Sequence, residues 1–325
     1  MGTKEQLLSL FENNKGIYFS GEDIAGKLCV SRAAVWKAVK ALQSDGYVID
    51  AVQNKGYCLS ENTDILSVQG IKKYLSPLCS DAEIEVFPVI NSTNTRAREK
   101  AEAGAGDFFT VISSEQTAGR GRRGRSFYSP GKTGVYLSIV LRPSHCTGEE
   151  AVRFTTMAAV AVCEAIEAVS GEKAEIKWVN DVFVRGKKVC GILTEASFGL
   201  EDGFLDYAVL GIGINASVPD GGFPPELRDI AGAVFENALS DGKNRLAAEV
   251  MNSFMSYYRG VCEKDYIEQY INRSFVTGKK VWVISPTSKK EAQVFGIDRQ
   301  CRLLVEYPDG KTEALSSGEI SIRLS

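Results

Sequence analysis

The sequence is poor in histidine, and its cysteines form no paired motif. His145 is the only histidine in 325 residues, which excludes a multi-histidine metal site and disfavours a catalytic triad built on histidine. The eight cysteines are scattered from Cys29 to Cys301 without a Cys-x-x-Cys pair, which indicates reduced thiols in a cytoplasmic protein rather than a disulfide framework or a zinc site. The chemistry of this chain must therefore rest on lysine, arginine, carboxylates and the backbone.

Long apolar runs and a strong excess of charge are also missing. The most apolar long stretch, Met157–Val169, contains Glu164 and Glu167, and the N-terminus has no apolar run behind a basic start, so we predict neither a membrane span nor a signal peptide. The formal net charge of −3 rules out a general electrostatic coat for nucleic acid, so any DNA binding must be local. The length predicts two or three domains.

Residues 1–62 carry the pattern of a winged helix-turn-helix domain. An apolar stripe predicts a first helix, Ser20 is a predicted N-cap for a short second helix, and Ser31 is a predicted N-cap for a third helix over Arg32–Ser44. Two strands, Tyr47–Val52 and Tyr57–Leu59, follow with a turn between them. The order helix, turn, helix and wing predicts a DNA-binding domain whose third helix is the recognition helix.

The predicted DNA contacts lie on the exposed side of the recognition helix and at the wing tip. They are Ser31, Arg32, Trp36, Lys37, Lys40 and Lys55. Recognition-helix cations reach guanine edges or phosphates, and the sequence leaves open which. The alternative is a small protein-interaction domain whose basic residues form a solvated face. A single winged module has limited affinity for DNA, so we expect a homodimer on a two-fold site.

Residues 63–274 alternate between helical and strand patterns. Strand-like runs cover Ile84–Val89, Phe108–Ser113, Gly134–Leu141, Glu175–Val184, Val189–Ser197 and Tyr207–Ile214. A turn at Arg185–Lys187 joins two of these runs as a hairpin rather than a crossover. The sequence therefore predicts a mixed or antiparallel sheet with helices, an α+β domain and not a doubly wound one.

The segment 119–125 reads GRGRRGR and satisfies the dinucleotide-binding fingerprint Gly-x-Gly-x-x-Gly. That fingerprint also needs a helix that begins at the loop and an acidic residue about 20 positions further on. Here Ser126–Pro130 cannot begin a helix, and residues 132–148 contain no Asp or Glu. A second false match, Gly131–Thr133, lacks the first glycine of a P-loop because that position is Ser126. A nucleic-acid patch and a mobile clamp for an anionic intermediate remain.

Four ordered motifs decide between them: SSEQTAGRGRRGRSFYSP, KWVND, GKKVCGILTE and GIGIN. With the winged helix in front, the chain resembles the bifunctional members of the biotin protein ligase family along essentially its whole length. The resemblance implies a central domain like that of class II synthetases and an SH3-like β-barrel over residues 275–325, where short strand patterns agree with it. Because the chain already has a DNA reader, the glycine- and arginine-rich loop is better explained as a lid over the ligand.

In that family, biotin and ATP condense to biotinyl-5′-AMP, and a lysine of a biotin carboxyl carrier domain then attacks the mixed anhydride. Negative charge gathers at the α-phosphate, so positioning and cationic clamping do most of the catalysis. Arginine forks suit phosphate and carboxylate oxygens, and a glycine-rich loop closes over a labile intermediate. The resemblance also implies Mg²⁺ with ATP, and an adenylate that acts as corepressor by promoting dimerisation and operator binding.

The resemblance assigns roles residue by residue. The implied catalytic residues are Lys188, Arg120, Arg122 and Asp181, the last also as the metal partner. The implied biotin residues are Ser92, Thr93, Asn94, Gln116, Arg120, Gly121, Arg122, Lys188 and Gly191. The implied ATP residues are Arg122, Phe127, Lys177, Asn180, Asp181 and Asn215.

Two positions depart from the family pattern. Val179 replaces the proline of a Lys-Trp-Pro-Asn-Asp motif, and Phe127 stands where tryptophan is common near adenine. Lys177 also fits the simpler role of a half-buried strand residue. Two other functions stay open: a biotin-sensing transcription regulator without catalysis, and a lipoate ligase-like enzyme with the same adenylate chemistry.

Overall fold

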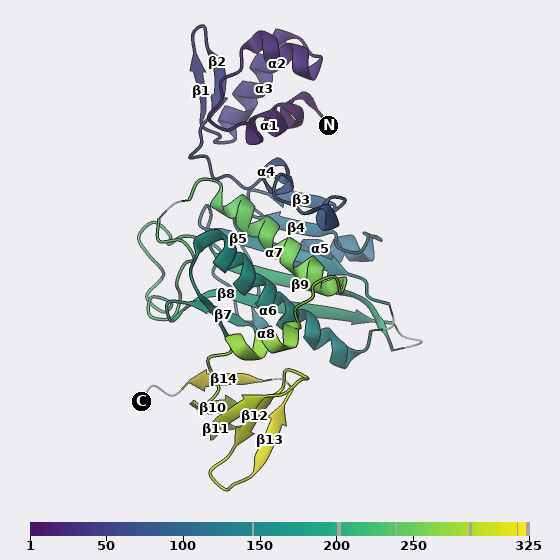
Figure 1. Ribbon diagram of the computed structural model, residues 1–325, viewed down its shortest axis with the longest axis vertical. Helices are drawn as coiled ribbons and strands as arrows, with labels where there is room; N and C mark the ends of the chain where they lie inside the picture. Colours follow the sequence, from purple (N-terminus) through teal and green to yellow (C-terminus); the bar gives the residue numbers. More distant parts are fainter. Residues whose placement is uncertain (145, 200–202, 238, 286–287, 317, 323–325) are drawn as a thin grey trace.

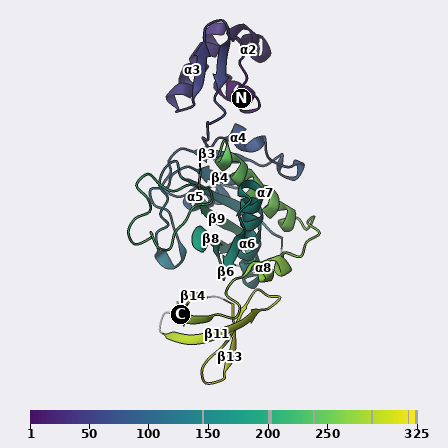
Figure 2. The same cartoon turned by 60° about the vertical axis from the view of Figure 1, so that its left-hand side comes forward.

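The computed structural model places three parts in a row, with the N-terminal and C-terminal parts at opposite ends of the central one (Figure 1). It describes residues 1–144, 146–199, 203–237, 239–285, 288–316 and 318–322. His145 lies outside the described residues. Figure 2 shows that α4 (Val68–Lys72) lies where the chain passes from the first part to the second.

The first part is a winged helix-turn-helix, as predicted. Its elements are α1 (Thr3–Glu12), α2 (Gly21–Leu28), α3 (Arg32–Ser44), β1 (Ile49–Val52) and β2 (Gly56–Leu59). The hydroxyl of Ser20 accepts from the backbone N–H of Asp23, and that of Ser31 accepts from Ala34, so both predicted N-caps are confirmed. Cys29 takes a left-handed conformation with φ 53° and makes the tight turn between α2 and α3. This part has an apolar core of its own.

The central part is built on a seven-stranded mixed sheet in the order β3-β4-β5-β9-β8-β7-β6. Its strands are β3 (Ile84–Phe87), β4 (Thr110–Ser113), β5 (Gly134–Leu141), β6 (Ala174–Lys177), β7 (Asp181–Val184), β8 (Lys187–Phe198) and β9 (Leu205–Asn215). Only the β3–β4 pair in this sheet is parallel. The predicted single run Glu175–Val184 was wrong as one strand, because residues 178–180 turn the chain and β6 pairs antiparallel with β7.

Helices cover both faces of this sheet. One face packs against α6 (Gly148–Ser170), with α7 (Gly242–Tyr258) and α8 (Tyr266–Arg273) beside it (Figure 1). The hydroxyls of Thr155 on α6 and Thr194 on β8 lie 2.7 Å apart and fix this orientation. The other face carries α5 (Thr93–Glu102), which packs on β4, β5 and β9. Short 3₁₀ turns occur at Pro77–Cys79 and at Arg122–Gly124.

The C-terminal part is a five-stranded antiparallel sheet in the order β13-β12-β11-β10-β14. Its strands are β10 (Lys280–Ile284), β11 (Lys289–Ile297), β12 (Leu303–Glu306), β13 (Thr312–Leu315) and β14 (Glu319–Ile322). Its buried apolar residues join the same cluster as those of the central part. The indole Nε1 of Trp178 also donates to the carbonyl of Cys301 at 2.9 Å, so the C-terminal sheet is fixed beside the turn between β6 and β7.

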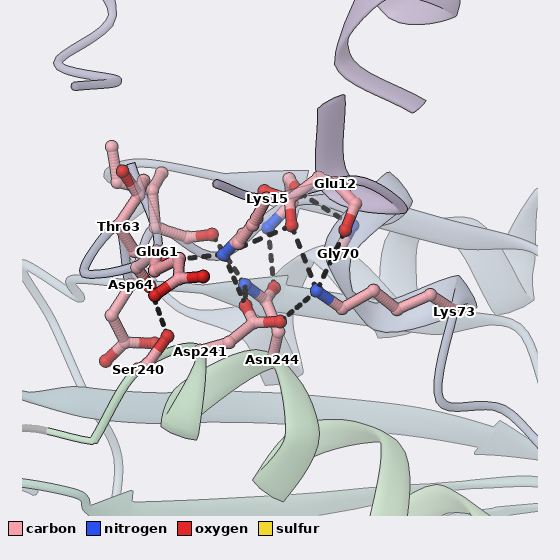
Figure 3. Close-up of polar contacts among 12 residues, drawn as sticks. Glu12, Lys15, Glu61, Thr63, Asp64, Gly70, Lys73, Ser240, Asp241 and Asn244 are labelled. Carbon is pink, nitrogen blue, oxygen red and sulfur yellow. Dashed lines mark hydrogen bonds and ion pairs between the residues drawn. The ribbon is translucent and has the colours of Figure 1, made fainter. Parts of the chain in front are cut away.

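The N-terminal part is attached differently, through buried charges (Figure 3). Glu12 at the end of α1 and Asp241 at the start of α7 are 2% and 3% exposed, and both pair with Lys15 and Lys73. Although burial raises the pKa of Asp241, hydrogen bonds from Lys73 and Asn244 outweigh it and hold that pKa below its usual value. At Glu12 burial wins and raises the pKa, and Oε1 has no hydrogen-bond partner. We call these four side chains the junction cluster.

The segment that links the two parts is also held in place. The amide of Asn244 accepts from the N–H of Ser67 and donates to the carbonyl of Ile65, and Asp64 accepts from the N–H of Lys243. The Nζ of Lys243 donates to the carbonyl of Lys132 at 2.8 Å, in the turn that follows the arginine-rich loop. Among the described residues, no helix combines the length and the apolar character that crossing a membrane requires.

Candidate active site

A cavity of about 170 Å³ lies over the sheet face opposite α6, and nearly all predicted site residues line it. From the sequence prediction it contains Ser92, Thr93, Asn94, Gln116, Arg120, Gly121, Arg122, Phe127, Lys177, Asn180, Asp181, Lys188 and Gly191. These residues come from α5, the arginine-rich loop, β6, β7, β8 and the turns between them. The fold therefore brings together motifs that are far apart in the sequence.

Glycines form the floor of this cavity. Gly191 on β8 pairs with Gly213 on β9, and a Cβ added to Gly213 would lie 2.6 Å from the ring of Phe127. A Cβ on Gly191 would lie 3.1 Å from the same ring. The ring of Phe127 is also edge-on to Tyr136, with centroids 6.3 Å apart. The strands thus need glycine at these positions so that an aromatic ring or a ligand can approach the backbone closely.

A chain of hydrogen bonds defines one end of the cavity. The backbone N–H and the hydroxyl of Thr93 both donate to Oε1 of Gln116, at 2.9 and 3.1 Å. The amide nitrogen of Gln116 donates to the hydroxyl of Ser129, which donates to the carbonyl of Phe127. Ser92 caps α5 through Thr95. These bonds connect the predicted biotin residues Ser92–Asn94 to the segment that directly follows the arginine-rich loop.

Asn94 and Arg120 meet at Glu195 on β8. The Nδ2 of Asn94 donates to Oε2 of Glu195 at 2.8 Å, and Nη1 of Arg120 lies 3.2 Å from Oε1. On its other side, Oδ1 of Asn94 accepts from the hydroxyl of Ser138 at 2.7 Å. A Cβ on Gly211 would lie 2.0 Å from that same oxygen, so this glycine is what lets Asn94 rest on the sheet.

The other end of the cavity carries an ion pair. Nζ of Lys188 lies 2.6 Å from Oδ1 of Asp181, both half-buried, on the neighbouring strands β8 and β7. Asn180 precedes Asp181, donates to the carbonyl of Ile192 and accepts from Nη1 of Arg122 at 2.9 Å. A cation, a carboxylate and an arginine therefore converge where the sequence predicts the phosphates of ATP.

The arginine-rich loop crosses the cavity as a small hairpin. Arg120 and Ser126 form an isolated antiparallel bridge, and the N–H of Gly121 donates to the carbonyl of Arg125 at 2.7 Å. Arg123 and Gly124 at its tip have positive φ, 56° and 73°. Arg120 reaches Glu195 on one side and Arg122 reaches Asn180 on the other. No helix follows the loop, which agrees with the rejection of the dinucleotide fingerprint.

Asn215 differs from the other predicted ATP residues. It is not among the residues that line the cavity, and its amide nitrogen donates to the carbonyl of Gly232 at 3.0 Å. It stands at the end of β9, two positions beyond Gly213. Its predicted role in ATP binding therefore stays a prediction.

Several lining residues were missed by the sequence reasoning. They are Arg123, Arg125, Ser126, Trp178, Ile192, Leu193, Gly211, Ile212, Gly213, Gly318 and Ile320. Gly211 and Gly213 carried a signal, since two glycines at alternate positions of a strand mark one face that something must approach closely. Gly318 and Ile320 carried none, because only the fold places the C-terminal sheet at the cavity. Among the described residues, no cluster of three metal-ligating side chains occurs.

The predicted DNA contacts are all exposed. Arg32, Trp36, Lys37 and Lys40 are exposed on α3, with Trp36 53% exposed. Ser31 caps the same helix, and Nζ of Lys55 at the wing tip lies 5.7 Å from the centre of the Tyr18 ring. Exposed cations on the recognition helix and at the wing tip are what DNA contact needs, and the role of these residues in binding DNA stays a prediction.

Comparisons with known proteins agree with this architecture. The model of the biotin/lipoate A/B protein ligase family matches residues 86–215, a helix-turn-helix domain model matches residues 3–58, and the biotin protein ligase C-terminal domain model matches residues 276–323. Among solved structures, biotin protein ligase from Aquifex aeolicus in complex with biotin and ATP covers 75% of this chain and 99% of its own, with a TM-score of 0.62. At 24% identity this likeness supports the fold.

Curated relatives extend the match to the whole chain. The bifunctional ligase/repressor BirA of Bacillus spizizenii is 33% identical over 279 residues, which cover 86% of this chain and 82% of the relative. Its namesake from Escherichia coli is 28% identical over 336 residues and covers 98% and 96% of the two chains. The chain therefore belongs to the biotin protein ligase family, among relatives named bifunctional ligase/repressors.

Proposed function

We propose that this protein is an ATP-dependent biotin protein ligase that also acts as a DNA-binding repressor of biotin genes. The observation that carries the proposal is the cavity itself. It has a hydrogen-bonded polar end at Thr93 and Gln116 and a cationic end at Lys188 and Arg122, and it lies in a chain of the matching family. A small acid with a polar ring and the triphosphate of ATP suit these two ends.

In the proposed first step, a carboxylate oxygen of biotin bonds to the α-phosphorus of ATP, and the bond to the β-phosphate oxygen breaks to release pyrophosphate. Lys188 and the two loop arginines, Arg120 and Arg122, reduce the repulsion between the anionic groups and stabilise the charge that gathers at phosphorus. Gly121 and Gly191 have no side chains, so the ligand can approach the protein backbone closely at these two positions. In the second step a carrier lysine amine forms an amide bond with the biotinyl carbonyl, AMP leaves, and the amine loses a proton to solvent.

Asp181 fits the role of Mg²⁺ partner. Magnesium in nucleotide sites usually takes one or two protein carboxylates and fills its other positions with phosphates and water, so a single lining carboxylate at the cationic end is sufficient. When bound, the ion would supply charge neutralisation for the phosphates of ATP. We also propose Phe127, Lys177, Asn180 and Asn215 as ATP-side residues. Phe127 offers an aromatic face, and Asn180 already holds Arg122.

The regulatory half of the proposal rests on the first part of the chain. Ser31, Arg32, Trp36, Lys37, Lys40 and Lys55 would contact operator DNA. Biotinyl-5′-AMP would serve as corepressor by favouring a homodimer, whose two winged helices bind a two-fold operator. The division of the chain into 1–62, 63–274 and 275–325 fits the matched domain ranges. We place the protein in the cytoplasm, where ATP, the chromosome and carrier proteins meet and where its eight cysteine thiols stay reduced.

The experiment is a transfer assay on a purified carboxyl carrier domain with ATP and Mg²⁺. Biotin, lipoate or neither is added, and the carrier lysine is followed by mass spectrometry. A biotin adduct with no lipoate adduct supports the proposal. A lipoate adduct alone would reassign the substrate. No adduct with either acid, together with tight biotin binding, would leave a biotin-sensing regulator without catalysis.

A further inference from the structure

We propose that Glu195 is a positioning residue that sets the biotin end of the cavity by holding Asn94 and Arg120 at once. It is not among the residues that line the cavity, so it acts through the two that do. This inference rests on the proposed function and names a residue that the four ordered motifs left without a role.

The geometry places Glu195 behind two ligand-facing groups. Its Oε2 accepts from Nδ2 of Asn94 at 2.8 Å, and its Oε1 lies 3.2 Å from Nη1 of Arg120. A second cation, Arg98 on α5, lies 4.0 Å from Oε1. The carboxylate is 26% exposed, so its two oxygens are used mainly by the protein. One side chain thus ties helix α5 to the arginine-rich loop.

The register of the sheet explains why Glu195 stands there. Side chains alternate along β8, so Gly191, Leu193 and Glu195 share the face that bears the cavity, whereas Thr194 faces α6. Gly191 forms the floor under the cationic end, and Glu195 lies four residues further along β8 at the polar end. Lys188 near the beginning of the same strand carries the ion pair with Asp181. Strand β8 therefore supplies Lys188 at the cationic end of the cavity and Glu195 at the polar end.

The charge of Glu195 also decides how Asn94 is oriented. An ionised carboxylate only accepts hydrogen bonds, so it must face the NH₂ group of Asn94 and not its oxygen. That orientation turns Oδ1 toward the hydroxyl of Ser138 at 2.7 Å and leaves the second N–H of Asn94 for the ligand. A glutamine at position 195 would remove this constraint, because its amide both donates and accepts. It would also remove the charge that holds Arg120.

The consequence is selective for one substrate. Loss of the Glu195 tether should weaken binding of biotin, whose site Asn94 and Arg120 border, and should leave the ATP end with its Lys188–Asp181 and Arg122–Asn180 contacts intact. Because Glu195→Gln weakens hydrogen bonds to a charged group, we expect the KM for biotin to rise roughly tenfold in this variant. The KM for ATP should stay within about twofold of the parent value.

The test compares Glu195→Gln, Glu195→Asp and the control Glu175→Gln in biotin-dependent pyrophosphate exchange. Glu175 on β6 does not line the cavity and forms an ion pair with the exposed Lys173, so its loss should change neither KM. The aspartate variant keeps the charge and should recover part of the affinity for biotin. Folding of each variant is checked by its thermal unfolding midpoint.

A second measurement needs no ligand. Trypsin cleaves after arginine, and the rate of cutting at residues 120–125 in the empty protein reports how often the loop opens. Glu195→Gln should be cut about three times faster than the parent protein, because the loop loses the charge that holds Arg120 and opens more often. Glu175→Gln should be cut at the parent rate.

The outcomes separate two failures. If the parent protein shows no biotin-dependent exchange, the proposed function fails, and the trypsin rates alone decide whether Glu195 holds the loop. If the parent is active but Glu195→Gln keeps its KM for biotin, or loses kcat alone, Glu195 does not position the biotin end. Equal cutting of the parent and Glu195→Gln would likewise contradict the tether.

Discussion

At the scale of single residues, the cavity depends on a few side chains with different tasks. Lys188 supplies a cation beside Asp181, Phe127 covers the glycine floor, and Gln116 organises the polar end. The catalytic claim rests mainly on Lys188, since a cation at the reacting phosphate is worth more than any single packing contact.

Replacing Lys188 by methionine keeps the length of the side chain and removes its charge. We expect kcat for pyrophosphate exchange to fall by about 10²–10³, the cost typical of losing one preorganised charge-stabilising group. Lys187→Met is the matched control, because Nζ of Lys187 donates to the carbonyl of Asp229 outside the cavity. Equal activity of the parent and the Lys188 variant would remove that residue from the mechanism.

Gly213→Ala tests the glycine floor. The added Cβ would lie 2.6 Å from the Phe127 ring, so the ring must move away from the floor into the space that ATP is proposed to occupy. We expect the KM for ATP to rise roughly tenfold while the unfolding midpoint changes little, since the ring borders a cavity into which it can shift. Gly106→Ala is the control, because a Cβ there meets no atom within 4 Å. An unchanged KM for ATP in Gly213→Ala would mean that this floor does not shape the site.

At the scale of elements, local patterns predicted best where caps and turns carry the information. The recognition helix was predicted over Arg32–Ser44 and has those bounds, because Ser31 caps it and the left-handed Cys29 ends the helix before it. The run Glu175–Val184 misled because its apolar alternation continues through a turn that only tertiary contacts define, among them the bond from Tyr270 to the carbonyl of Val179. Propensity does not encode such contacts.

Helix α6 shows a similar limit. The sequence shows apolar residues along it, yet the structure buries residues 158–163 on all sides, because the helix lies between the sheet and α7 with α8. The cavity could be assembled from the sequence only through the family resemblance. Its C-terminal contributors, Gly318 and Ile320, are linked to it by no local pattern.

The recognition helix gives a prediction of its own. Lys40→Ala should weaken binding to any duplex by a similar factor and reduce the slope of log K against log salt by about one, because a phosphate contact carries no sequence information. Binding of the parent and the variant to one nonspecific duplex is measured at several salt concentrations. Lys311→Ala, between β12 and β13, is the control, because the C-terminal sheet lies at the opposite end of the molecule from the winged helix (Figure 1). An unchanged slope in Lys40→Ala would place that lysine away from the DNA backbone.

At the scale of the whole molecule, the N-terminal and C-terminal parts are attached to the central part by different kinds of interaction. The C-terminal sheet shares the apolar core of the central part, whereas the winged helix is held by the junction cluster (Figure 3). Buried ion pairs add less net stability than apolar packing but favour one arrangement over others, because an unpaired buried charge is costly. The cluster therefore fixes one orientation of the DNA-binding part. Sequence alone could not show it, since Glu12 and Asp241 lie far apart along the chain.

Asp241→Asn should cost about 2 kcal/mol of unfolding free energy at pH 7, because Lys15 and Lys73 lose a shared anion. Asparagine tolerates the left-handed backbone at this position, φ 58°, so the change adds no backbone strain. Urea unfolding provides the measurement. A loss below about 0.5 kcal/mol would show that the cluster does not hold the junction.

Glu12→Gln should behave differently with pH. The raised pKa of Glu12 means that its contribution is present below the usual value of 4.5 and is lost as the pH rises through the folded-state pKa. The parent should therefore exceed Glu12→Gln in stability by more at pH 4 than at pH 7. The lowered pKa of Asp241 has the opposite sign, since its contribution is present above 3.8 and is lost as the pH falls through its folded-state pKa. A parent-minus-variant difference for Glu12→Gln that grows with pH would contradict this assignment.

The central claim is that the cavity over the glycine floor joins biotin to ATP. The most direct measurement is pyrophosphate exchange into ATP by the purified protein with Mg²⁺, with biotin, with lipoate and with neither. The account predicts exchange that depends on biotin and is lost in Lys188→Met. Exchange without biotin, exchange that lipoate supports equally, or no exchange at all would contradict it.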